Sequence, residues 1–326
     1  MTAAGGVLAG ALALLVIAGS AQAGKLWPAP CPTKAAKACL ARAKRAKNPE
    51  LAVALAATAY VRALKRYETA LAARAREVFQ KVSKAHRKLP ALEGQLRGAC
   101  KRADTNACLV LGFFLLQTKR YAEVAPPLRR ACAAKDSYAC LALATEHEKG
   151  RGAAKDQGKA IAMLQKACTS GNMYACTNLA YDYGAGHGVP KNRTKAIALL
   201  RKACRGKDML GCNNLAMELL QMPKARDTKR AIALLRRACD GGEMNGCLNL
   251  AGRYHDAAGV PRNWPKALAL FRRACDNGKA VGCFYQALML SRGGHGVKKR
   301  AARAKKRFRR ACQGGYAKAC ARARSR

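Results

Sequence analysis

The residues best suited to covalent chemistry are sixteen cysteines, all of which fall into C-x7-C pairs. On one straight helix, residues eight apart are separated by roughly 12 Å along the axis, whereas a disulfide needs Cα atoms about 4.4–6.8 Å apart. A bridged pair therefore requires the chain to reverse between its members, and turn sequences such as Ser170-Gly171-Asn172 stand there. The pairs are Cys31/Cys39, Cys100/Cys108, Cys132/Cys140, Cys168/Cys176, Cys204/Cys212, Cys239/Cys247, Cys275/Cys283 and Cys312/Cys320.

Zinc binding and free thiols are the alternatives to disulfides. Structural zinc sites usually present C-x2-4-C knuckles, and the sequence has none. Free buried thiols would not need an even count or strict pairing. We therefore predict eight local disulfides and no metal, each disulfide closing a loop of about nine residues and contributing about 2.5 kcal/mol by chain entropy.

The first 23 residues carry no charged side chain. An apolar run from Val7 to Ala18 leads to Ala21-Gln22-Ala23, which is a small-x-small cleavage site. We predict a signal peptide over residues 1–23; a retained N-terminal anchor is the alternative. Export to an oxidising compartment agrees with disulfide formation.

The cysteine pairs also mark an internal repeat. From Cys100 onward, the first cysteines of the pairs step by 32, 36, 36, 35, 36 and 37 residues, the size class of solenoids. Between pairs, Cys176, Leu179, Ala180 and Tyr183 share one helical face. A Gly-rich segment then ends that helix, and a capping residue begins the next one. The predicted capping residues are Asp156, Asn192, Asp227 and Asn263.

The segment Gly186 to Ala196, followed by Ala-Cys-x7-Cys, resembles the Sel-1-like repeat, a relative of the tetratricopeptide repeat. With its paired cysteines the chain is most similar to secreted, cysteine-rich Hcp-type members. The resemblance covers residues 99–326 and implies an all-α fold, an α-solenoid (superhelix) of antiparallel helix pairs. We interpret residues 24–98 as a helical region with divergent tetratricopeptide-like repeats.

The resemblance implies binding rather than catalysis, although some Hcp-type relatives bind penicillins or act as weak β-lactamases. The residues give that alternative little support. No serine after the signal peptide is followed by Lys at the third position, as a serine β-lactamase requires. The histidines are scattered across repeats, and His187 and His295 each stand between glycines. We assign no catalytic residue and expect no cofactor.

The charge of the chain is strongly positive. The formal net charge is +44, and no acidic residue follows Asp276. A basic pair precedes most first cysteines, in the last turn of a predicted helix, where the helix dipole favours cations. The alternative to that structural role is a ladder of positive charge that binds a polyanion. The candidate residues are Arg129, Arg130, Arg201, Lys202, Arg236, Arg237, Arg272, Arg273, Arg309 and Arg310.

The sequence thus predicts an exported, monomeric repeat scaffold in the periplasm or outside the cell. Its expected partner is a protein or an anionic cell-envelope polymer. Only 6% of the residues are aromatic, which argues against recognition of nucleic acid by base stacking.

Overall fold

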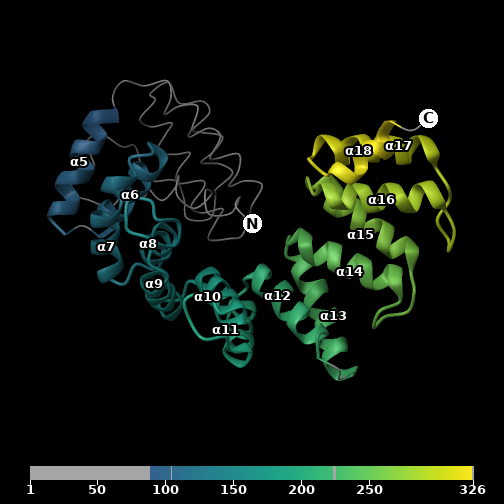
Figure 1. Ribbon diagram of the computed structural model, residues 1–326, viewed down its shortest axis with the longest axis horizontal. Coiled ribbons are helices and arrows are strands. Elements are labelled where there is room, and N and C mark those ends of the chain that lie inside the picture. The colour runs from purple at the N-terminus through teal and green to yellow at the C-terminus, as the bar shows by residue number, and fades with distance from the viewer. Residues whose placement is uncertain (1–88, 104, 223–224, 325–326) are drawn as a thin grey trace, which may run out of the picture. The chain divides into compact units, whose positions relative to one another are not determined.

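The computed structural model describes residues 89–103, 105–222 and 225–324, and within them the chain is helical throughout (Figure 1). No β-strand forms in this part of the chain; Gly294 and Val297 make one isolated bridge. The predicted signal peptide, the pair Cys31/Cys39 and residues 24–88 lie outside the described residues.

The first compact unit of the fold extends to Lys191. From α5 to α10, each described helix of this unit packs against its neighbour in sequence within the unit. The described helices are α5 (Leu89–Lys101), α6 (Thr105–Gln117), the 3-10 helix η3 (Tyr121–Glu123), α7 (Ala125–Ala133), α8 (Ser137–Lys149), α9 (Gln157–Thr169) and α10 (Met173–Ala185).

The second compact unit begins at Asn192 and follows the same rule of neighbour-to-neighbour packing. This arrangement of consecutive helix pairs is an α-solenoid, which confirms the predicted fold class. The helices are α11 (Arg193–Arg205), α12 (Met209–Leu220), α13 (Ala225–Asp240), α14 (Met244–Asp256), α15 (Trp264–Asp276), α16 (Ala280–Arg292), α17 (Ala301–Gln313) and α18 (Ala317–Arg324).

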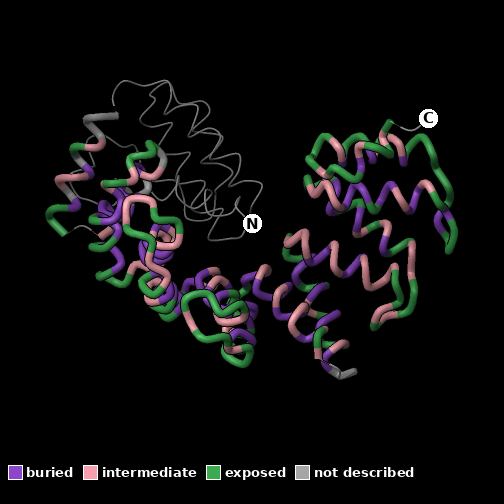
Figure 2. Tube along the Cα trace, in the orientation of Figure 1, coloured by how far each residue is buried: buried purple, intermediate pink, exposed green. Residues whose placement is uncertain are grey.

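Leu, Ala and Cys side chains make up most of the core. Figure 2 shows buried positions recurring along successive helices. From α8 to α16, each even-numbered helix carries a cysteine in its first turn and an alanine four residues later. These alanines are all buried: Ala144, Ala180, Ala216, Ala251 and Ala287. Such small side chains let neighbouring helices approach closely, so an Ala- and Leu-rich sequence suits this stacking.

The turns between odd- and even-numbered helices share one hydrogen-bond pattern. At the end of α9, the N–H of Gly171 donates to the carbonyl of Cys168, and the N–H of Asn172 donates to that of Ala167. These two bonds define a Schellman motif. The donor of the first bond has a left-handed backbone, which glycine adopts without strain. Gly171, Gly242, Gly278 and Gly315 occupy that position, but at three other turns it holds Ala103, Lys135 and Lys207.

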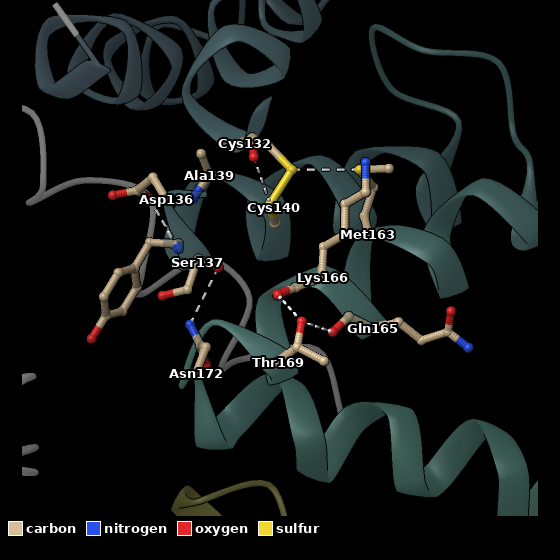
Figure 3. Close-up of a disulfide and its surroundings, with 11 residues drawn as sticks. Cys132, Asp136, Ser137, Ala139, Cys140, Met163, Gln165, Lys166, Thr169 and Asn172 are labelled. Atoms are coloured by element: carbon tan, nitrogen blue, oxygen red, sulfur yellow. Dashed lines mark hydrogen bonds between the residues drawn. A yellow bond between two sulfur atoms is a disulfide. The ribbon is translucent and has the colours of Figure 1, made fainter. Parts of the chain in front are cut away.

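Side-chain caps begin seven of the described helices, on both sides of these turns. The side chain of Asp136 accepts hydrogen bonds from the N–H groups of Tyr138 and Ala139 at the start of α8 (Figure 3). Asn172 caps α10 and also donates to the carbonyl of Ser137, which connects two successive turns (Figure 3). Because the carboxylate or amide replaces missing intrahelical partners, each cap fixes where its helix begins.

Three of the four helix caps predicted from sequence are confirmed: Asp156, Asn192 and Asn263 each accept a hydrogen bond from the N–H three residues later. The prediction for Asp227 is wrong, because α13 begins at Ala225 and Asp227 lies inside its first turn. The sequence 225–227 continues the helix toward its N-terminus, and an acidic residue in a first turn is favoured by the helix dipole.

Seven disulfides join odd-numbered helices to the even-numbered helices that follow them. Their Cα–Cα distances run from 4.5 Å at Cys204–Cys212 to 4.8 Å at Cys312–Cys320. No free cysteine occurs among the described residues. The Cys132 sulfur lies 3.6 Å from the Met163 sulfur on α9, so this bridge packs against the next helix as well (Figure 3).

The bridges belong to the hydrophobic core rather than to a surface site. The sequence predicted that the cysteines form local disulfides, and the seven described pairs do so. In Cys100–Cys108, Cys132–Cys140 and Cys275–Cys283, both cysteines are buried. Cys108, Cys140 and Cys283 enter the core because each stands in the first turn of an even-numbered helix, on the face that packs against the helix before it. Their role is therefore structural, and they are not accessible to a ligand.

We predict that removing one bridge destabilises the array without changing its fold. The double variant Cys204→Ser/Cys212→Ser should lose about 2.5 kcal/mol of unfolding free energy, because a closed loop of about nine residues is opened in the unfolded chain. Denaturant unfolding followed by circular dichroism measures the loss. Peptide mapping without reduction should recover eight local pairs, Cys31–Cys39 included; any long-range pair in that map would contradict the architecture.

Candidate functional site: a basic ladder and a basic groove

The ten cations predicted as a ladder lie in the last turns of α7, α11, α13, α15 and α17. Within each pair, the first member is exposed in every case: Arg129, Arg201, Arg236, Arg272 and Arg309. None of these five makes an ion pair with a described residue, and Arg236 donates a hydrogen bond to the Tyr254 hydroxyl. These five first members are together called the arginine ladder below, a name for their place in the repeat and not for an alignment of the two units.

The second members have a different environment. Arg130 donates to the Cys100 carbonyl at the end of α5. Arg273 contacts Asp240 at the end of α13, and Arg310 contacts Asp276 at the end of α15, both at 3.4 Å. Three of the five second members thus reach the C-terminal end of the odd-numbered helix one repeat earlier, where the helix dipole favours a cation. The other two second members are Lys202 and Arg237.

The C-terminal end of the ladder borders a groove with a volume of about 1260 Å³. Side chains of α15 and α17 form its sides, and Gln286 and Leu290 of α16 line it between them. Eight of the lining residues are Lys or Arg, and Asp276 is the one acid among them. Three ladder candidates, Arg272, Arg309 and Arg310, meet in this groove, which we call the basic groove.

Residues that the sequence analysis did not single out dominate the basic groove. Arg303, Lys306 and Arg307 project from α17, and Lys298 and Arg300 come from the segment before it. Arg307 Nη1 lies 2.9 Å from Asp276 Oδ1, and Arg310 also contacts this oxygen. The only carboxylate of the groove lining is therefore shared by two guanidinium groups. The other cations of the groove therefore face solvent with their charge uncompensated by the groove's own residues.

Three of the four described histidines pack against aromatic rings. His187 lies 5.3 Å from Tyr181 between ring centroids, and Trp264 lies between His255 and His295, at 5.1 and 4.5 Å. The described residues contain no group of three or more His, Cys, Asp or Glu side chains that could hold a metal ion. The geometry of these loops supports packing, and it offers nothing in favour of a β-lactam-hydrolysing site.

Buried acids form a second polar feature, in the first unit. Glu146 is 1% exposed and pairs with Arg151 at 2.9 Å. Burial raises the pKa of the Glu146 carboxyl above its usual value, and Arg151 offsets part of this rise. Asp182 is buried on α10, and its Oδ2 has no hydrogen-bond partner among the described residues. Burial, with a further contribution from the charge of Glu148, raises the pKa of Asp182 to about 7.

Two features of the described residues bear on where the protein works. A set of seven disulfides indicates an oxidising, non-cytoplasmic compartment. Within the described part of the chain, no helix has both the length and the apolar character needed to cross a membrane.

Stacked helix pairs with a bridge at each turn define the class: a disulfide-stapled helical repeat protein. The family model for the Sel1 repeat matches residues 137–172, 174–208, 210–243 and 245–279. The chain therefore contains four Sel1 repeats between residues 137 and 279. The bridges Cys168–Cys176, Cys204–Cys212 and Cys239–Cys247 each join one matched repeat to the next, as the spacing predicted.

Solved structures support the same fold. A Sel1 repeat protein from Oxalobacter formigenes is 22% identical, with a TM-score of 0.57 over 64% of this chain and 83% of that one. A protective antigen with an SLR fold from uropathogenic Escherichia coli strains is also 22% identical, with a TM-score of 0.56 over 88% of this chain. The chain spans 63% of the length of that antigen. No curated protein matches the sequence significantly.

Sel1 repeats generally mediate interactions between proteins, so the array is an interaction scaffold. The narrower resemblance to Hcp-type members stays a prediction.

We predict that the buried Asp182 makes stability depend on pH. Between about pH 4 and pH 7 the folded carboxyl holds a proton that the unfolded one has released, so the free energy of unfolding falls as pH rises. Asp182→Asn should therefore raise the melting temperature at pH 8 and leave it nearly unchanged at pH 4. Thermal unfolding across this range tests it, with the exposed Asp256→Asn as control. Equal shifts at both pH values would contradict the prediction.

Proposed function

We propose that the protein is an exported scaffold whose arginine ladder binds an anionic partner, either a polymer of the cell envelope or an acidic protein. The observation that carries the proposal is the state of the five first-position arginines. They are exposed near the ends of α7, α11, α13, α15 and α17, with Gln165 at the corresponding place on α9, and no described acid neutralises them. Charges that recur from repeat to repeat suit a ligand that is itself a repeating anion.

The split between the two ladder positions supports this function over a purely structural role. If helix-end stabilisation were the sole reason for the basic pairs, one cation in each last turn would suffice. Three of the five second members already contact the helix end of the preceding repeat. The first members add positive charge that no described acid neutralises, at a cost in self-repulsion.

The compartment and the composition narrow the class of partner. We infer that residues 1–23 direct export and that the protein acts in the periplasm or outside the cell, where envelope polymers carry phosphates and carboxylates. Nucleic acid fits less well, because aromatic side chains for stacking are sparse.

The ladder is tested with the triple variant Arg129→Gln/Arg201→Gln/Arg236→Gln, which leaves the basic groove intact. Its affinity for lipopolysaccharide or for polyglutamate at low salt should fall about tenfold, and its affinity should depend less steeply on salt, because fewer counterions are released. Retention on an immobilised polymer with a salt gradient measures both quantities.

A charge-matched control separates the ladder from the net charge of the chain. The triple variant Arg102→Gln/Lys229→Gln/Arg262→Gln removes three exposed cations that lie off the ladder. It should retain nearly wild-type binding. Equal losses in the two triple variants would refute the ladder, and no retention of the wild type at low salt would refute polyanion binding altogether.

A further inference from the structure

Gln286 is a polar residue at a position that holds leucine in the preceding described repeats. Three residues after the cysteine of each even-numbered helix from α6 to α14 stands a leucine, and all five are buried: Leu111, Leu143, Leu179, Leu215 and Leu250. On α16 the same position, three residues after Cys283, holds Gln286, which is also buried, at 5% exposure. This repeat has therefore replaced a core leucine with an amide.

The following helix departs from the pattern over the corresponding stretch. In α9, α11, α13 and α15, the residues seven to five places before the cysteine are apolar, as in Ile197-Ala198-Leu199 and Leu268-Ala269-Leu270. In α17 the same three places hold Lys305-Lys306-Arg307. Both α16 and α17 thus carry polar residues where the other repeats pack apolar side chains, and residues of α15, α16 and α17 line the basic groove.

The amide of Gln286 is incompletely satisfied. Its Oε1 is buried and accepts no hydrogen bond from the described residues, while the side chain lines the basic groove. A buried polar atom without a partner is unfavourable, and native proteins keep few of them. A ligand that reaches α16 between the cations would supply the missing partner.

We propose that the basic groove is a binding site for an acidic, extended peptide segment of a partner protein. The inference deepens the proposed function, since it rests on the array being a scaffold for anionic partners, and it names a specific subsite and ligand. Gln286 binds the main chain of the segment, and the groove cations bind its carboxylates.

The chemistry of the residues that line the basic groove favours a peptide over a sugar as its ligand. A side-chain amide offers one acceptor and one donor, which match the N–H and C=O of a peptide unit in either orientation of the amide. Arg303 and Lys306 make no ion pair with a described acid and can receive carboxylates. Leu268, Leu290 and Val297 offer an apolar patch for an aliphatic side chain, whereas no aromatic ring lines the groove for stacking on a sugar.

The charge of this chain argues that the segment belongs to another molecule. The protein has 18 acidic residues against 62 basic ones, and none of the acids follows Asp276. A second copy would bring the same excess of positive charge to the groove. An acidic partner is the occupant with complementary charge.

The test uses the full-length oxidised protein and three fluorescent probes. The first is an acetylated, amidated hexapeptide of alternating Asp and Leu, and the second is the same peptide with methylated backbone nitrogens. The third is an oligogalacturonate, an anionic sugar with no peptide unit. Binding is measured by fluorescence anisotropy at several salt concentrations.

The informative variant is Gln286→Leu, which restores the residue that the preceding repeats carry and so preserves the fold. It should bind the hexapeptide about tenfold more weakly, the loss expected for one buried hydrogen-bonded contact. The methylated peptide should bind wild type and Gln286→Leu equally weakly, because the donor to Oε1 is gone. Arg303→Gln should weaken hexapeptide binding and reduce its salt dependence, while Arg262→Gln, outside the groove, should change neither.

Three results would overturn the proposal. Hexapeptide affinity that is unchanged in Gln286→Leu would show that the buried amide binds no ligand. Equal affinity of wild type for the two peptides would show that charge alone is recognised. Binding of the sugar that depends on Gln286, without such dependence for the peptide, would assign the groove to glycans. Retention on envelope polymer is measured separately. A negative result for the basic groove therefore leaves the test of the arginine ladder unaffected.

Discussion

The fold depends on one constraint: the chain reverses within a few residues between successive repeats, and a disulfide closes each described reversal. A solenoid repeat packs only on its neighbours, so long-range contacts cannot compensate for a weak junction. Burial of Leu and Ala side chains stabilises the stacking of the helices. The Schellman turn and its cap fix the direction in which the next helix begins. The covalent bridge holds this geometry against the repulsion of a chain with a net charge of +44, and salt does not alter it.

Adjacent positions on one helical turn divide the basic residues into two roles. Consecutive residues point about 100° apart around a helix, so Arg272 and Arg273 face different surroundings although they are neighbours in sequence. Arg273 turns toward Asp240 of the preceding repeat, and Arg272 lines the basic groove. The same dipeptide thus has two roles. One residue stabilises the stacking of the repeat, and the other presents positive charge in the groove.

Features that depend on spacing were predictable from sequence, and features that depend on how repeats meet were not. The C-x7-C interval is a geometric statement about a turn, and Asp156, Asn192 and Asn263 cap their helices because capping is local. The prediction that Asp227 caps a helix was wrong, because the helix extends two residues further, to Ala225. Gln286 was visible in the sequence as a departure from five leucines, but its meaning required the groove beside α17, which brings together residues more than thirty positions apart.

The turn residues with left-handed backbone make the solenoid mechanically uneven. Glycine costs nothing at this position after α9, α13, α15 and α17, whereas Ala103, Lys135 and Lys207 occupy it with a side chain, at a cost of about 1–2 kcal/mol each. The glycine junctions after α9, α13, α15 and α17 are therefore the more compliant ones among those with a described bridge, because a residue without a Cβ tolerates a wider range of backbone angles. Bending that adapts the array to a long partner would concentrate there, and the rest would move as stiff blocks.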